Sequence, residues 1–212
     1  MRDAYHEELE AIVSDLVEMT NSVSNAMASA STALLDADLQ LAQKVIEEDV
    51  SIDKVYHQIE MRALDLLARQ QPVASDLRTI VTSLRMVADI ERAGDLALHV
   101  AKVARRRYPL SSVPAQMRST ILEMGQVAQM IMTKCGDVIR TQDVELAHEL
   151  ERDDDAMDTL HKRIFGQILD LNVGLEAAID ITLVGRYYER FADHAVSVAR
   201  RVVYLVTGER VG

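Results

Sequence analysis

The chain has 212 residues, of which 49% are hydrophobic and 27% charged, a composition typical of a folded protein rather than a disordered one. Only three prolines, eight glycines and two phenylalanines occur, which favours helices over sheets. The formal net charge of −11 argues against nucleic-acid binding, because nucleic-acid-binding domains carry a basic surface.

The first half of the chain shows the pattern of long helices. Apolar residues from Leu9 to Ala33 alternate spacings of three and four, which predicts a first helix that ends near Asp36. Asp38 is expected to cap a second helix that runs to Gln71-Pro72. A third helix should begin near Ser75 and end at Tyr108, because the following proline disfavours a helical residue before it.

The second half continues the pattern. A fourth helix is expected to begin near Pro114, with Ser112 as its cap, and to run to about Thr141. Two more helices are expected at 143–172 and 175–207. Cys135 lies within the fourth helix and has no second cysteine to pair with, so it is interpreted as a packing residue. No apolar run approaches membrane-spanning length and the N-terminus lacks the apolar segment of a signal peptide, so we expect the protein in the cytoplasm.

The second half of the sequence repeats the first. Residues 38–42 (DLQLA) match 143–147 (DVELA) at an offset of 105, and 91–95 (ERAGD) match 189–193 (ERFAD) at an offset of 98. Each half is large enough to bury a core of its own. The sequence therefore predicts an all-α fold of two tandem, pseudo-symmetric three-helix bundles, at residues 1–108 and 109–212.

Both halves contain acidic residues four positions apart, where like charges share one helix face and repel. The pairs are Asp49/Asp53, Glu91/Asp95, Asp154/Asp158 and Glu189/Asp193. Within each half the two pairs are equidistant from the hairpin turn, so they should lie at one height and face each other. Neighbouring helices lie about 8–10 Å apart, a gap that carboxylates can close around a cation.

The chemistry of these pairs favours a metal site. One acidic pair on a long helix is most often a solvated face, whereas four pairs in matching register favour a shared function. Carboxylates suit hard cations such as Mg²⁺, Ca²⁺, Mn²⁺ or iron. His99 and His161 lie close enough in sequence to join and to admit zinc, but neither has a counterpart in the other half, where Ser197 and Tyr56 stand. Both histidines are therefore left out of the predicted site.

Three segments, set in two three-helix repeats, resemble the PhoU family, the cytoplasmic regulators of bacterial phosphate uptake. They are RQQPVASDLR (69–78), DIERAGDLALHVAK (89–102) and RYYERFADHAVSVAR (186–200). In that family E(D)-x-x-x-D motifs bind metal clusters in some members. The resemblance implies such ligands at Glu91/Asp95 and Glu189/Asp193, and at Asp49/Asp53 and Asp154/Asp158 with Asp in place of Glu. The second copy reads VGLEAAID after its turn, so it does not duplicate Arg78.

The resemblance also implies a role and partners. The protein would relay phosphate sufficiency from the phosphate ABC importer, through its ATPase subunit, to a membrane sensor histidine kinase, and so keep the starvation response off. It would lie at most at the membrane surface and bind iron, zinc, manganese or magnesium. The long apolar seams favour a homodimer.

Two alternatives remain at this point. Di-iron enzymes use Glu-x-x-His from two helices, and this chain offers only Glu145 and His148, with Gln40 and Gln43 at the related positions. No Gly-rich phosphate loop occurs either, so no enzymatic turnover is expected. A purely structural scaffold would explain the apolar seams but not the matched acidic pairs. The run Arg105-Arg106-Arg107 could contact phosphate or anionic lipid, but at a helix C-terminus it is interpreted as complementing the helix dipole.

Overall fold

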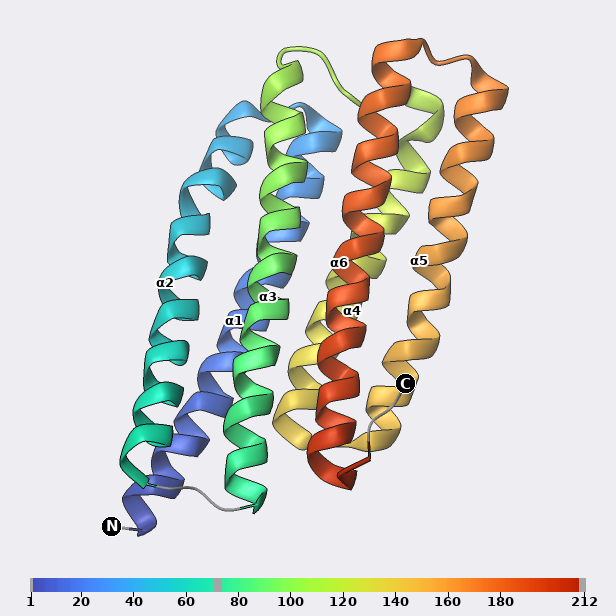
Figure 1. The fold of residues 1–212 in the computed structure, drawn as a ribbon. Coiled ribbons are helices and arrows are strands. Elements are labelled where there is room, and N and C mark those ends of the chain that lie inside the picture. The colour runs from blue at the N-terminus through green and yellow to red at the C-terminus, as the bar shows by residue number, and fades with distance from the viewer. Residues whose placement is uncertain (1, 71–73, 210–212) are drawn as a thin grey trace.

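The computed structural model describes residues 2–70 and 74–209, and in these ranges the chain is helical, apart from short connections. Figure 1 shows the six α-helices as long rods that run alongside one another. A 3₁₀ turn, η1 (Ala115–Met117), precedes the fourth. The helices are α1 (Arg2–Asp36), α2 (Leu39–Gln70), α3 (Ala74–Arg107), α4 (Arg118–Thr141), α5 (Val144–Leu171) and α6 (Leu175–Thr207).

Four of the helices form the centre of the molecule. α1 packs against α3 and α4, and α6 packs against the same two helices. α2 covers α1 and α3 on one side, and α5 covers α4 and α6 on the other, as Figure 1 shows. The prediction of an all-α fold with two related three-helix halves is confirmed.

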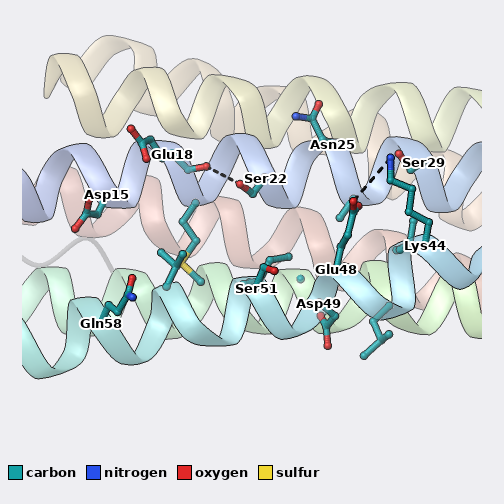
Figure 2. A pocket seen from close by; sticks show the side chains of 17 residues that line it. Asp15, Glu18, Ser22, Asn25, Ser29, Lys44, Glu48, Asp49, Ser51 and Gln58 are labelled. Atoms are coloured by element: carbon teal, nitrogen blue, oxygen red, sulfur yellow. Dashed lines mark hydrogen bonds and ion pairs between the residues drawn. The ribbon is translucent and has the colours of Figure 1, made fainter. Parts of the chain in front are cut away.

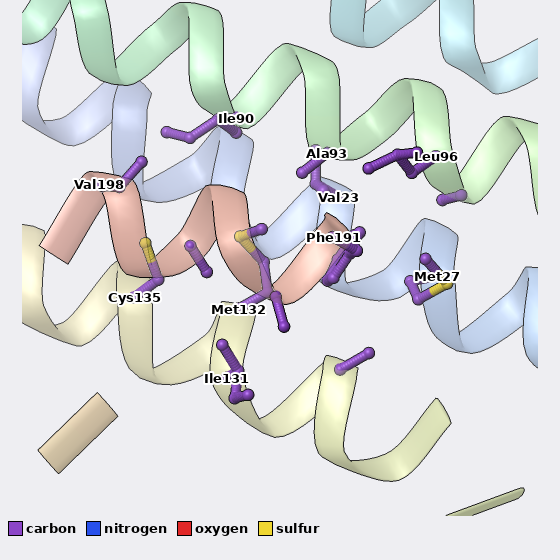
Figure 3. Close-up of a cluster of buried hydrophobic side chains, with 14 of the residues drawn as sticks. Val23, Met27, Ile90, Ala93, Leu96, Ile131, Met132, Cys135, Phe191 and Val198 are labelled. Atoms are coloured by element: carbon purple, nitrogen blue, oxygen red, sulfur yellow. The ribbon is translucent and has the colours of Figure 1, made fainter. Parts of the chain in front are cut away.

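The two halves share a single core. Figure 3 shows Met27 of α1, Ile90 of α3, Met132 of α4 and Phe191 of α6 in one apolar cluster, and the buried side chains of both halves belong to it. The predicted boundary between residues 108 and 109 falls between α3 and η1. Residues of both halves contribute to this one core, so the structure does not show that either half folds independently. The division into two domains stays a prediction. Cys135 is fully buried in this cluster, and burial raises the pKa of its thiol, so the thiol stays protonated and serves as a packing residue.

Buried polar contacts also join the halves. The Tyr188 hydroxyl of α6 donates to Ser31 Oγ of α1 at 2.7 Å. The carboxylate of Asp89, on α3, accepts from Arg201 Nε at 2.8 Å and lies 3.3 Å from His194 Nδ1, both on α6. Because such groups stay buried only with partners, these contacts fix how the two halves pack.

The predicted helix starts are mostly confirmed. Asp38 accepts from the Leu41 backbone N–H at 3.0 Å, and Asp143 accepts from Glu145 and Leu146. The prediction for Ser112 was wrong, since its hydroxyl donates weakly to the Val103 carbonyl at 3.5 Å and caps nothing. The predicted turn at Gln71-Pro72 lies outside the described residues.

α4 begins without a side-chain cap. Pro114 precedes the 3₁₀ turn, and α4 itself starts only at Arg118. Met117, just before it, is fully buried in the core, so apolar packing holds this helix start in place. In the part of the chain that the structure describes, none of the helices has the length and apolarity needed to cross a membrane.

Candidate functional site

The first acidic set consists of Asp49 and Asp53 on α2 and Glu91 and Asp95 on α3. Burial raises the pKa of Asp49 to about 6, helped by repulsion from Asp53 and Asp95 and opposed by Lys102. Burial also raises the pKa of Glu91, with repulsion from Asp95 and Asp53 adding to it. Since each helix feels the charges of the other, the two pairs face each other as the hairpin register predicts.

The second acidic set repeats this arrangement between α5 and α6. Burial raises the pKa of Asp154 to about 6, and repulsion from Asp193, Asp158 and Glu189 adds to it. Burial and the charge of Asp193 raise the pKa of Glu189, against the opposing effect of Arg186. The structure therefore brings all eight predicted carboxylates into two facing sets, one in each half.

One carboxylate oxygen of the second set lacks a hydrogen-bond partner among the described residues. Arg186 donates to Glu189 Oε1, but Glu189 Oε2 is buried and has no hydrogen-bond partner among the described residues. The same holds for His161 Nε2. The imidazole of His161 acts to lower the pKa of Glu189, so the ring lies within electrostatic reach of that carboxylate. Two polar groups from facing helices, within electrostatic reach of each other, thus each have one buried atom without a hydrogen-bond partner, which is unusual for buried polar atoms.

Sequence reasoning left His161 out because the first half has Tyr56 at the related position. The hydroxyl of Tyr56 likewise lies within electrostatic reach of the acidic residue on the facing helix, since burial, Glu60 and then Glu91 raise its pKa. Tyr56 satisfies its hydroxyl by donating to Glu60 at 3.3 Å, whereas His161 Nε2 stays unsatisfied. The signal that could have identified His161 was its spacing of three residues from Asp158. His99, also left out, packs edge-on against Tyr187 with the ring centroids 5.3 Å apart.

The side chains of the two sets have the donor atoms that a cation prefers, but these side chains are not gathered closely enough to hold one. Each set offers several oxygen donors whose mutual repulsion a positive charge would relieve. In the described residues, however, no three His, Cys, Asp or Glu side chains are gathered so that they could hold one metal ion. Binding would therefore require side-chain rotation, and the metal prediction stays a prediction.

A pocket of about 530 Å³ borders the first acidic set. It lies between α1 and α2, and Asp49 and Gly94 form part of its wall. Figure 2 shows the side chain of Glu48 reaching toward α1, whereas that of Asp49 points away from α1. Glu48 is paired with Lys44 at 3.8 Å. The pocket is thus a groove lined by both polar and apolar side chains, and it touches the first acidic set at its edge.

The di-iron alternative finds no support in the geometry. His148 Nδ1 lies 3.2 Å from Glu151 Oε2, in a surface pair that Arg200 extends by donating to Glu151 Oε1 at 2.6 Å. Glu145 belongs to the first turn of α5, where its backbone N–H is capped by Asp143. Of the one Glu-x-x-His element of the chain, His148 therefore belongs to a surface ion-pair network and Glu145 to the first turn of α5.

Comparison with known proteins identifies the family of this chain. The family model described as the PhoU domain matches twice, at residues 16–104 and 121–202, one match in each half. The chain is 47% identical over 210 residues to the phosphate-specific transport system accessory protein PhoU homolog 2 of Mycobacterium tuberculosis, covering 98% of this chain and 99% of that protein. It is also 47% identical to PhoU homolog 1 of Mycobacterium leprae, covering 98% and 95% of the two chains.

Solved structures agree with this result. The crystal structure of PhoU from Pseudomonas aeruginosa matches with a TM-score of 0.88 and 30% identity, over 97% of this chain and 100% of that one. The phosphate transport system regulatory protein PhoU from Streptococcus pneumoniae shares the fold, with a TM-score of 0.86 at 23% identity, over 98% and 99% of the two chains. The chain therefore belongs to the PhoU family, whose members are regulatory and accessory proteins rather than enzymes.

Proposed function

We propose that this protein represses the phosphate-starvation response by coupling the state of the phosphate importer to a sensor histidine kinase. The observation that carries the proposal is the similarity over nearly the whole chain to accessory proteins of the phosphate-specific transport system. The protein would act in the cytoplasm and contact the ATPase subunit of the importer and the kinase at the membrane surface.

The ends of the two hairpins are suitable contact surfaces for these partners. At the end of α5–α6, Leu169 and Leu175 are 81% and 78% exposed. Their repeat-related residues Leu64 and Leu77, at the end of α2–α3, are exposed as well. The two hairpin ends lie at opposite ends of the molecule in Figure 1. Exposed apolar groups that recur at related positions are typical of interaction surfaces.

A paired substitution tests these surfaces. Replacing Leu169 and Leu175 by Ser should reduce co-purification of the importer ATPase subunit or the kinase from phosphate-replete cells. Leu122→Ser with Met130→Ser is the matched control, because these exposed apolar residues lie on α4, outside both hairpin ends. Equal loss in both variants would reject the hairpin ends as the contact surface. Light scattering of the same proteins tests whether the chain is a homodimer.

The acidic sets are proposed as cation sites within this role. Asp49, Asp53, Glu91 and Asp95 would hold one site; Asp154, Asp158, Glu189 and Asp193 would hold the other. A bound iron, zinc, manganese or magnesium ion would supply positive charge and draw the two helices of a hairpin together. The support is the raised pKa of Asp49 and Asp154, one in each set, which burial causes and repulsion from neighbouring carboxylates increases.

The regulatory role is tested by deleting the gene. In phosphate-rich medium the deletion strain should express phosphate-starvation genes, and a plasmid copy of the wild-type protein should silence them again. Metal analysis of the protein purified from the complemented strain identifies the ion. Normal repression in the deletion strain would reject the regulatory proposal, whatever metal the protein contains.

A further inference from the structure

An open pocket between the C-terminal part of α3 and the middle of α6 is lined by basic side chains. It has a volume of about 530 Å³, within the range of small-molecule sites. The lining residues are His99, Lys102, Val103, Arg105, Arg106 and Tyr187. None of these six residues is acidic, although the chain carries a net charge of −11.

The arginines of this pocket are held in place by polar contacts. Arg106 Nη2 donates to Asp180 Oδ1 at 2.5 Å, and Asp180 is almost fully buried. Arg105 Nη1 donates to Gln43 Oε1 at 3.3 Å. The side chain of Arg106 nevertheless remains 57% exposed, so its guanidinium is fixed at one edge and open to solvent at the rest. A fixed, partly exposed guanidinium loses little freedom when it binds a ligand.

Asp180 does not cancel the charge of the pocket. Its other oxygen, Oδ2, accepts from Arg107 Nε, and Arg107 also donates to Glu176 at 2.9 Å. Arg107 is absent from the pocket wall, so it can neutralise Asp180 from the far side. The interpretation of the arginine run as a partner for the helix dipole therefore fits Arg107, whereas Arg105 and Arg106 turn toward the pocket.

The first acidic set lies near the pocket. Lys102, which lines the pocket, lowers the pKa of Asp49, so its ammonium lies within electrostatic reach of that carboxylate. His99 packs on Tyr187 and gives the pocket an aromatic wall. The pocket thus combines two guanidinium groups, one ammonium, an imidazole and a phenol.

The internal repeat shows that the fold does not require these cations. The position related to Arg105, 98 residues further along the chain, is Val203, and the position related to Arg106 is Tyr204. The position related to Lys102 is Arg200, which is occupied by an ion pair with Glu151 at 2.6 Å. The basic pocket is therefore specific to the first repeat, because the related positions of the second repeat do not provide these cations.

We propose that this pocket binds a small anion that carries a phosphate-type group. Guanidinium forks recognise phosphate oxygens through paired, charge-assisted hydrogen bonds, and a lysine adds a point charge. The phosphate group can belong to free inorganic phosphate or to a larger phosphorylated metabolite. The site is separate from the proposed cation sites and does not depend on the regulatory role.

Titration calorimetry of the purified protein in about 0.15 M salt tests the proposal. The probes are inorganic phosphate and ADP. The test variant is Lys102→Gln with Arg105→Gln, which removes two charges from the pocket and leaves Arg106 and Arg107 on Asp180. The control variant is Arg69→Gln with Arg163→Gln, which removes the same charge from exposed ion pairs on α2 and α5.

At least one probe should bind the wild-type protein saturably. The pocket variant should weaken that binding by about tenfold or more, and the control should change it by no more than about twofold. Binding of phosphate without ADP identifies free phosphate as the ligand, and tighter binding of ADP identifies a phosphorylated metabolite. If the double variant loses its helical circular dichroism, Lys102→Gln alone carries the test. Absence of binding to wild type by either probe up to about 10 mM, or equal loss in pocket and control variants, would overturn the proposal.

Discussion

Asp154 of α5 and Asp193 of α6 repel each other across the hairpin that joins their helices, and this is the strongest charge effect on the raised pKa of Asp154. In the other half, Asp95 of α3 acts in the same way on Asp49 of α2. The repeat therefore preserves an arrangement that costs stability when no cation is present. The stability of the protein should therefore depend on pH.

Replacing Asp154 or Asp49 by Asn should stabilise the protein at neutral pH. Both carboxyl groups have a folded-state pKa of about 6, above the unfolded value of about 3.9. The stability linked to the protonated form is fully present below about pH 4 and is lost as the pH rises through 6. Because both groups are partly exposed to solvent, we expect a gain of only about 1 kcal/mol for each variant at pH 7.5.

Urea denaturation in metal-free buffer at pH 7.5 and pH 4 measures this effect, and the gain should nearly vanish at the lower pH. Asp137→Asn, in an exposed pair with Arg140, is the control and should show no such gain. A gain that is the same at both pH values would show that charge repulsion is not its source.

Asp89→Asn should destabilise the protein strongly, because Asp89 joins α3 to α6. Burial raises the pKa of this carboxyl group, but hydrogen bonds from His194 and Arg201 outweigh that effect and leave the pKa below its usual value. The contribution to stability is therefore present above the unfolded pKa and is lost as the pH falls through the folded one. We expect a loss of about 2 kcal/mol at pH 7, since the substitution removes the anion that accepts hydrogen bonds from the half-buried Arg201 and from His194. The loss should shrink below pH 4; an unchanged unfolding midpoint at pH 7 would contradict this account.

Tyr188→Phe should cost about 1 kcal/mol, because the hydroxyl donates to Ser31 in the buried contact between α6 and α1. Ser31 in turn donates to the Met27 carbonyl at 2.7 Å, so the serine hydroxyl keeps one hydrogen-bond partner in the variant. Thermal unfolding measures the loss. Tyr108→Phe, at an exposed position, should leave the melting temperature unchanged, and a comparable drop in both variants would assign the effect to something other than this contact.

The helices and the facing acidic sets could be predicted from the sequence because both depend on local spacing. Apolar residues at spacings of three and four fix which face of each helix is buried, and Asp38 and Asp143 mark two helix starts. The position of each acidic pair relative to its hairpin turn then fixes its height. These features require no knowledge of contacts between distant segments.

The remaining features depend on contacts that spacing does not encode. An apolar seam shows that a helix face is buried but not which helix covers it, so the shared core of the two halves was not predicted. Ser112 is a good cap by residue type, but packing of the fully buried Met117 moved the helix start to Arg118. His161 was set aside because it has no counterpart in the repeat, and only the structure brings it within electrostatic reach of Glu189. The contact of Arg106 with Asp180 joins residues far apart in the sequence.

The proposed cation sites predict how variants respond to metal. Glu189→Gln with Asp193→Asn removes both the ligands and the repulsion in the second set. Without metal, this double variant should be as stable as the wild type or slightly more so. The first set, with Glu91 and Asp95, would keep its own site, so bound metal should fall to about half if the two sites are independent. The corresponding variant of the first half, Glu91→Gln with Asp95→Asn, should behave in the same way.

The melting temperature during titration with a metal ion tests most directly whether the facing carboxylates bind cations. It is measured for the wild type and for the Glu189→Gln, Asp193→Asn variant, with Mg²⁺, Mn²⁺, Fe²⁺ and Zn²⁺ in turn. With at least one of these ions, the wild-type melting temperature should rise with the logarithm of the metal concentration, and the variant should gain less. Equal responses of the two proteins to all four ions would contradict the claim.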